Sequence, residues 1–101
     1  MNKYKITLLS KAQDDIAECI NFLLKVSIEA AKSLKEDLYD AIESLSKYPE
    51  KNPVFEMPSS FRFIVRKQIV NKRYIILYSE VLDGIYVYRV LDGRRNFDGL
   101  L

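Results

Sequence analysis

The spacing of apolar residues changes twice along this 101-residue chain, and these changes limit the folds open to it. Residues 3–9 alternate apolar and polar side chains, as a strand with one buried face does. Two stretches, beginning after Ser10 and after Ser27, then repeat apolar residues at helical spacing. Beyond residue 60 the period returns to two. The pattern predicts strand, helix, helix, strand, strand, strand in a single domain over residues 1–101.

The two predicted helices form a hairpin. We expect Ser10 to cap the first helix, with Gln13 completing a capping box, and Ser27 to cap the second. The second helix should end near Lys47, ahead of Pro49. The link around residues 25–27 is very short, which makes the helices antiparallel neighbours. The stripe expected to be buried consists of Ile16, Ile20, Leu23, Leu34, Leu38 and Ile42.

The second half of the chain predicts a proline-containing loop and three strands. Residues 48–60 hold all three prolines and indicate the loop. Residues 61–66, 74–81 and 85–91 are the predicted strands, with Asp83-Gly84 as a hairpin turn. The expected fold class is α+β: a helical hairpin packed on one face of an antiparallel sheet, with the other face free for a partner.

The composition excludes several kinds of chemistry. The chain has no His, which removes His-dependent nucleophile triads, and its single Cys19 allows no zinc site and no internal disulfide. Its three glycines are isolated, so they form no Gly-rich phosphate loop. We therefore expect no metal and no cofactor. The lone cysteine and the lack of a leader-like or membrane-length apolar run predict a cytoplasmic protein without membrane contact.

Positive charge is concentrated near the C-terminus. Residues 61–101 hold 8 Lys/Arg against 4 Asp/Glu, whereas residues 1–60 hold 8 against 10. This asymmetry suggests an anionic partner on one face. Guanidinium groups could hold its phosphates or carboxylates, although an ordinary solvent-facing role is the alternative for each cation. Even spacing would place Arg62 and Arg66 on one strand face. The cations are Arg62, Arg66, Lys67, Lys72, Arg73, Arg89, Arg94 and Arg95.

Three segments together resemble the RelE/ParE toxin superfamily. Residues 4–16 (YKITLLSKAQDDI) are similar to its opening strand and helix start, and residues 73–78 (RYIILY) to its central strand. Residues 87–97 (VYRVLDGRRNF) resemble its final strand with a Gly-Arg-Arg-type tail, which is the most specific of the three. The resemblance implies a toxin that a cognate antitoxin holds inactive.

The superfamily has two kinds of target. RelE-like members cleave mRNA on the ribosome without a metal, using Arg, Lys and a general base that is often a C-terminal Tyr or His. ParE-like members block DNA gyrase without a known catalytic site. The segment after Arg95 contains neither Tyr nor His, which is closer to ParE. The resemblance therefore implies a gyrase poison. From the cations of the strands and the tail, we expect its target-binding residues to be Arg62, Arg66, Arg89, Arg94 and Arg95.

Two alternatives stay open from the sequence. The first is a RelE-like ribonuclease that acts on ribosome-bound mRNA. Its candidate catalytic residues are Arg62, Arg66, Lys67, Arg94, Arg95 and Tyr88. The second is a harmless protein that only binds an antitoxin.

Overall fold

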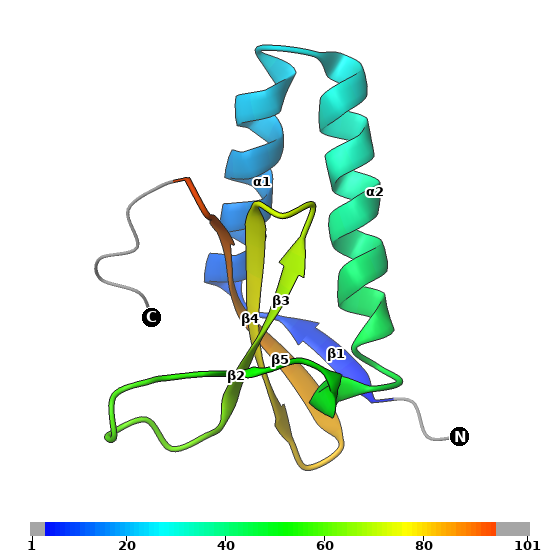
Figure 1. The fold of residues 1–101 in the computed structure, drawn as a ribbon. Helices are drawn as coiled ribbons and strands as arrows, with labels where there is room; N and C mark the ends of the chain where they lie inside the picture. Colours follow the sequence, from blue (N-terminus) through cyan, green and yellow to red (C-terminus); the bar gives the residue numbers. More distant parts are fainter. Residues whose placement is uncertain (1–3, 95–101) are drawn as a thin grey trace.

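The structure, a computed structural model, describes residues 4–94 and has two helices packed on a five-stranded sheet (Figure 1). The predicted fold class and order of elements are confirmed, and a short strand, β2, is added. In chain order the elements are β1 (Lys5–Leu8), α1 (Ser10–Leu24), α2 (Ile28–Ser44), the 3₁₀ turn η1 (Pro49–Lys51), β2 (Val54–Phe55), β3 (Val65–Val70), β4 (Tyr74–Val81) and β5 (Gly84–Asp92).

The sheet is mixed, with strand order β1-β5-β4-β3-β2. Strands β2 to β5 are antiparallel, as expected, but β1 lies parallel to β5, with Lys5 opposite Gly84. The helical hairpin explains this difference. It returns the chain to the end of the sheet where β1 begins, and there the Tyr4 N–H donates to the Ser46 carbonyl at 3.0 Å. From that end, β3, β4 and β5 run in alternating directions, so β5 runs in the same direction as β1.

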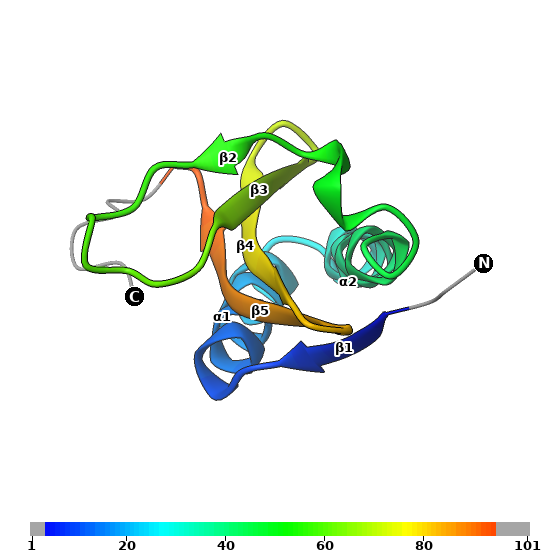
Figure 2. The ribbon, with the colours of Figure 1, turned by 90° about the horizontal axis from the view of Figure 1, so that it is seen from below.

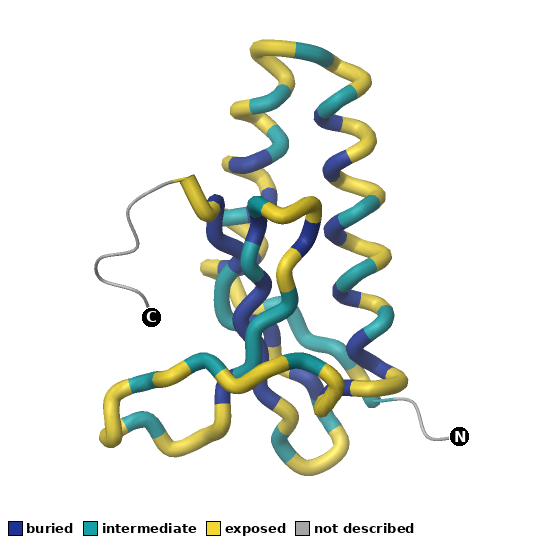
Figure 3. Tube along the Cα trace, in the orientation of Figure 1, coloured by how far each residue is buried: buried dark blue, intermediate teal, exposed yellow. Residues whose placement is uncertain are grey.

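The two helices cover one face of the sheet, which Figure 2 shows from below. Of the predicted stripe, Ile16, Leu34, Leu38 and Ile42 are buried against β4 and β5. Ile20 and Leu23 are only half-buried. Both pack at the margin of the core cluster. The tip of the hairpin extends past the sheet, and few residues are buried there (Figure 3). No helix among residues 4–94 is long and apolar enough to cross a membrane.

The helix ends agree only in part with the sequence pattern. Ser27 caps α2 as predicted, because its Oγ accepts the Ala30 N–H at 3.1 Å. Ser10, by contrast, is the first residue of α1 rather than its cap. Leu9 occupies the cap position, held by its own N–H to the Val87 carbonyl at 3.1 Å. The expected capping box is absent there, and Gln13 Nε2 donates instead to the Leu8 carbonyl.

The outer face of the sheet, meaning the face turned away from the helices, is not fully free as predicted. Residues 53–64 fold over part of it, and Phe55, Met57 and Phe61 pack on Val65, Leu77 and Leu91. The Ser79 hydroxyl fixes this segment by donating to the Ile64 carbonyl at 2.6 Å. Residues 61–64 are consequently not a strand, and β3 begins only at Val65.

The strand ends depend on two tight turns. Strand β4 has the predicted bounds, but Leu82 and Asp83 form the turn that follows it, and Gly84 opens β5. Asn71 and Lys72 make the turn from β3 to β4, both with positive φ. This turn places Arg73 beside the end of β5, with its N–H donating to the Val70 carbonyl at 3.1 Å.

Candidate functional site

The C-terminal end of β5 is held by a two-point contact with Arg73. The Arg73 guanidinium forms a bidentate pair with Asp92, with Nε–Oδ1 and Nη2–Oδ2 distances of 2.9 and 2.8 Å. The Arg73 carbonyl accepts the Gly93 N–H at 2.7 Å. The hydrogen bond with Asp92 raises the pKa of Arg73. Both the side chain and the backbone of Arg73 therefore hold the residues that end β5.

Gly93 and Arg94 are placed by the same contact. A Cβ on Gly93 would lie 2.5 Å from the Arg73 carbonyl oxygen, so no larger residue fits without a shift. The Arg94 N–H donates to Asp92 Oδ1 at 3.0 Å, and Arg94 itself is exposed. Sequence reasoning identified Arg94 but missed Arg73 and Asp92 as its supports. The Asp-Gly pair was a signal for a turn, but nothing nearby in sequence indicated the ion pair.

Arg89 is engaged within the fold. Its Nε and Nη2 donate to the carboxylate of Asp15 on α1 at 2.6 and 2.9 Å. The same carboxylate accepts the Val90 N–H at 2.9 Å, and so satisfies the edge of β5 where pairing with β1 has ended. The hydrogen bond with Asp15 raises the pKa of Arg89. Much of the hydrogen-bonding capacity of Arg89, and its charge, are therefore used inside the molecule.

Arg66 lies on the other face of β3 from Lys67. It is opposite Tyr78 in the sheet, and its Nη1 donates to the Asn52 carbonyl at 2.7 Å. Asn52 Nδ2 in turn donates to the Tyr78 hydroxyl and to Gln68 at 3.0 and 2.9 Å. Burial raises the pKa of Tyr78, partly opposed by the hydrogen bond from Asn52. This network attaches the segment around η1 to the sheet.

The remaining candidates lie around the outer face. Arg62 is exposed in the segment before β3, so the prediction that Arg62 and Arg66 share a strand face is wrong. Lys67 is half-buried opposite Leu77, whose own partner across the sheet is Arg89. The ring of Tyr88 packs edge-on against Phe61, with 5.6 Å between ring centroids. Arg95 lies outside the described residues.

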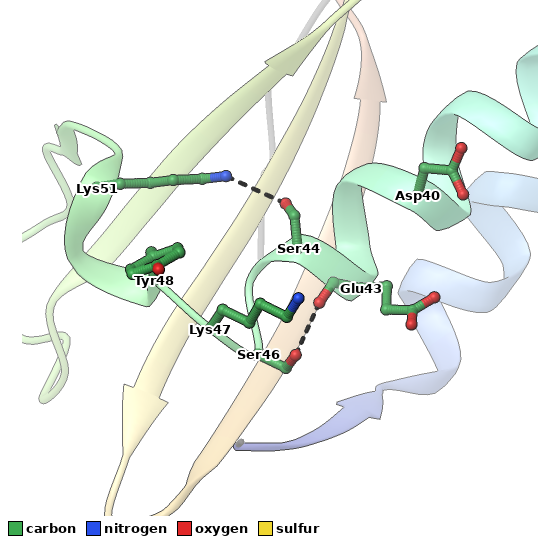
Figure 4. Close-up of a pocket in the computed structure, with 7 residues that line it drawn as sticks. All are labelled: Asp40, Glu43, Ser44, Ser46, Lys47, Tyr48 and Lys51. Atoms are coloured by element: carbon green, nitrogen blue, oxygen red, sulfur yellow. Dashed lines mark hydrogen bonds between the residues drawn. The ribbon is translucent and has the colours of Figure 1, made fainter. Parts of the chain in front are cut away.

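Among the described residues, the predicted site residues share neither a metal site nor the surface hollow described below. Within residues 4–94 no group of three or more His, Cys, Asp or Glu side chains could hold a metal ion. A surface hollow of about 460 Å³ lies beside the last turns of α2 and the segment that follows them (Figure 4). Lys51 Nζ donates there to Ser44 Oγ at 3.2 Å, as suits a cation at a helix C-terminus. None of the predicted site residues lines this hollow.

The sequence model of one toxin family matches most of the chain. It is described as the ParE toxin of the type II toxin–antitoxin system parDE, and it matches residues 6–97. The chain belongs to the ParE toxin family. The match extends through the Asp-Gly-Arg turn after β5, and the resemblance to the RelE/ParE superfamily is thereby confirmed, on the ParE side.

Comparison of the folds agrees with membership of the ParE family. A solved chain from the chromosomal ParDE toxin–antitoxin system of P. aeruginosa superposes with a TM-score of 0.70 at 14% identity. The similarity covers 89% of this chain and 96% of that one. At this low identity the likeness shows a shared fold. No curated protein matches the sequence.

Proposed function

We propose that this ParE-family chain is a toxin that poisons DNA gyrase and that a cognate antitoxin neutralises it. The observation that best supports the proposal is the end of β5. The Gly93 backbone packs closely against the Arg73 carbonyl. Arg94, the first cation of the ParE-type Gly-Arg-Arg ending, is exposed, and its N–H is held by Asp92. An exposed guanidinium on a backbone held in this way is suited to a charge-assisted contact with another macromolecule.

The arrangement of the other candidates favours binding over catalysis. A ribonuclease of this type needs a base close to cations that stabilise charge on the phosphate. Tyr88, a candidate base, packs against Phe61, and its neighbour Arg89 is paired with Asp15. Arg66 lies on the opposite face of β3 from Lys67, and the chain has no His. Among residues 4–94, the separation of Arg66 from Lys67 and the pairing of Arg89 with Asp15 both favour a binding role.

The outer face is the surface that we propose for the antitoxin. It combines exposed apolar side chains, those of Phe63, Ile64 and Ile69, with exposed or half-buried cations. Arg62 and Lys67 make no ion pair with another residue in the described part of the chain. An antitoxin segment that carries both apolar and acidic residues would complement this surface.

The proposal is tested with the purified chain in two assays. We expect it to block DNA supercoiling by gyrase and to leave ribosome-bound mRNA intact. Arg94→Ala should weaken inhibition by about 1–3 kcal/mol, the size of a lost charge-assisted contact. Lys25→Ala, at the distant tip of the hairpin, is the control that should inhibit like the unchanged chain.

Two results would contradict the proposal. Position-specific cleavage of mRNA on ribosomes, lost in Arg94→Ala, would place this chain with the ribonucleases. Expression that leaves cell growth unaffected in the absence of an antitoxin would indicate a protein that only binds antitoxin.

A further inference from the structure

We infer that Arg73 is a positioning residue, which fixes how the chain leaves β5 and so determines where Arg94 meets the target. This inference rests on the proposed function, since it concerns the same contact with gyrase. Arg73 itself lies in the turn between β3 and β4, and the inference requires no contact between Arg73 and the target. Its role follows from what it holds.

Two features hold Arg73 in place: the turn that precedes it and its buried partner Asp92. On one side, the turn at Asn71 and Lys72 adopts positive φ, which L-residues rarely do, and it fixes the backbone of Arg73. On the other side, Asp92 is buried, with only 8% of its surface exposed. The Arg73 guanidinium also lies 5.2 Å from the centre of the Tyr74 ring. This cation–π contact further restricts the Arg73 side chain.

The same contact determines the path of the next two residues. Gly93 approaches the Arg73 carbonyl so closely that its N–H donates to that oxygen at 2.7 Å. Asp92 uses one oxygen for two partners, the Arg73 Nε and the Arg94 N–H. Loss of the guanidinium would remove two hydrogen bonds that hold the Asp92 carboxylate, and one of them is to Oδ1, the oxygen that accepts the Arg94 N–H. The direction of the chain at Arg94 therefore depends on a side chain from the turn between β3 and β4.

The experiment combines amide hydrogen exchange of the full ¹⁵N-labelled chain with inhibition of supercoiling. In Arg73→Ala we expect exchange of the Gly93 and Arg94 amides to rise by about tenfold or more relative to that of Leu38, which reports opening of the core. The toxin concentration that half-inhibits gyrase should rise by about tenfold or more, because misplacing a group weakens the contact that it makes. Arg73→Lys keeps the charge without the bidentate geometry and should fall between.

A matched control separates positioning from a general loss of stability. Ser27→Ala removes the cap of α2 at the far end of the molecule and destabilises the fold without touching β5. It should raise exchange at Gly93 and Arg94 no more than at Leu38, and it should leave inhibition as in the unchanged chain.

Each other outcome decides against the inference in its own way. Full inhibition by Arg73→Ala, despite faster exchange at Gly93 and Arg94, would show that this geometry is unimportant for the target and would leave the proposed function standing. Lost inhibition with unchanged exchange would make Arg73 a direct contact instead. An unchanged chain that does not inhibit gyrase would overturn the proposed function, and with it the role assigned to Arg73 there.

Discussion

At the scale of single residues, ion pairs separate two of the described arginines, Arg73 and Arg89, from two exposed ones, Arg62 and Arg94. The guanidinium of Arg73 forms a bidentate pair with Asp92, and that of Arg89 forms one with Asp15. Asp92 ends β5, and Arg89 lies three residues before it in the same strand. Both pairs are largely shielded from solvent, so each group that lost its partner would be a poorly solvated charge. Arg62 and Arg94 are exposed and carry their charge outward. Arg62 and Arg94 are therefore well placed to meet a partner.

Tyr78 provides a prediction about pH. Its hydroxyl donates to the Pro49 carbonyl, and burial raises its pKa, so the folded state favours the neutral phenol. This contribution to stability is complete below the pKa of an unfolded tyrosine, about 10, and is lost as pH rises through the higher pKa of the folded state. Tyr78→Phe should therefore show a smaller fall in unfolding free energy between about pH 9 and pH 11.

Urea unfolding at several pH values measures this effect. Tyr48→Phe, which removes an exposed phenol, should keep the alkaline fall of the unchanged chain. An identical fall in Tyr78→Phe would mean that the phenol of Tyr78 titrates equally in the folded and unfolded states.

At the scale of elements, the contact of α2 with the sheet contributes strongly to stability. Leu38 lies in the middle of the buried stripe with none of its surface exposed. Leu38→Ala should lower the unfolding free energy by about 2–5 kcal/mol, the range for a buried leucine. Lys35→Ala, on the exposed side of the same helix, is the comparison. A loss below about 0.5 kcal/mol for Leu38→Ala would mean that α2 packs through a different face.

Local patterns predicted the elements well and their partners poorly. The helical period identified both helices, Ser27 was correctly predicted as a cap, and an apolar run predicted the bounds of β4, because these features depend on neighbours in sequence. The parallel pairing of β1 with β5 depends on residues from opposite ends of the chain, and no periodic pattern encodes it. Residues 61–64 alternate like a strand, but Phe61 instead covers the outer face, where its packing overrides the local preference.

The candidate site shows the same division. The sequence identified the exposed cations, since a basic ending stands out in composition. It could not show that Arg89 is paired with Asp15, because that carboxylate comes from α1. Nor could it show that Asp92 turns inward toward Arg73, since an aspartate before a glycine is common in turns of every kind.

At the scale of the whole molecule, the outer face predicts how an antitoxin complex responds to salt. Raising the salt concentration from about 0.1 M to about 1 M shortens the Debye length from about 10 Å to about 3 Å. Binding of the cognate antitoxin should weaken over that range, because we propose that exposed cations contribute to it. Calorimetry would measure the change, and Arg62→Ala should reduce the dependence on salt. Affinity that is flat across the range would mean that the apolar side chains hold the antitoxin alone.

The pairing of β1 with β5 also has a consequence for how the protein is made. Lys5 leaves the ribosome early, but its partner Gly84 is among the later residues to be synthesised. The hairpin of α1 and α2 can form while the chain grows, since its contacts are local. The sheet cannot close on β1 until β5 has emerged, and the carboxylate of Asp15 must also wait for Val90. The fold therefore cannot be completed until most of the chain has been synthesised, and translation delays the appearance of the folded protein in the cell.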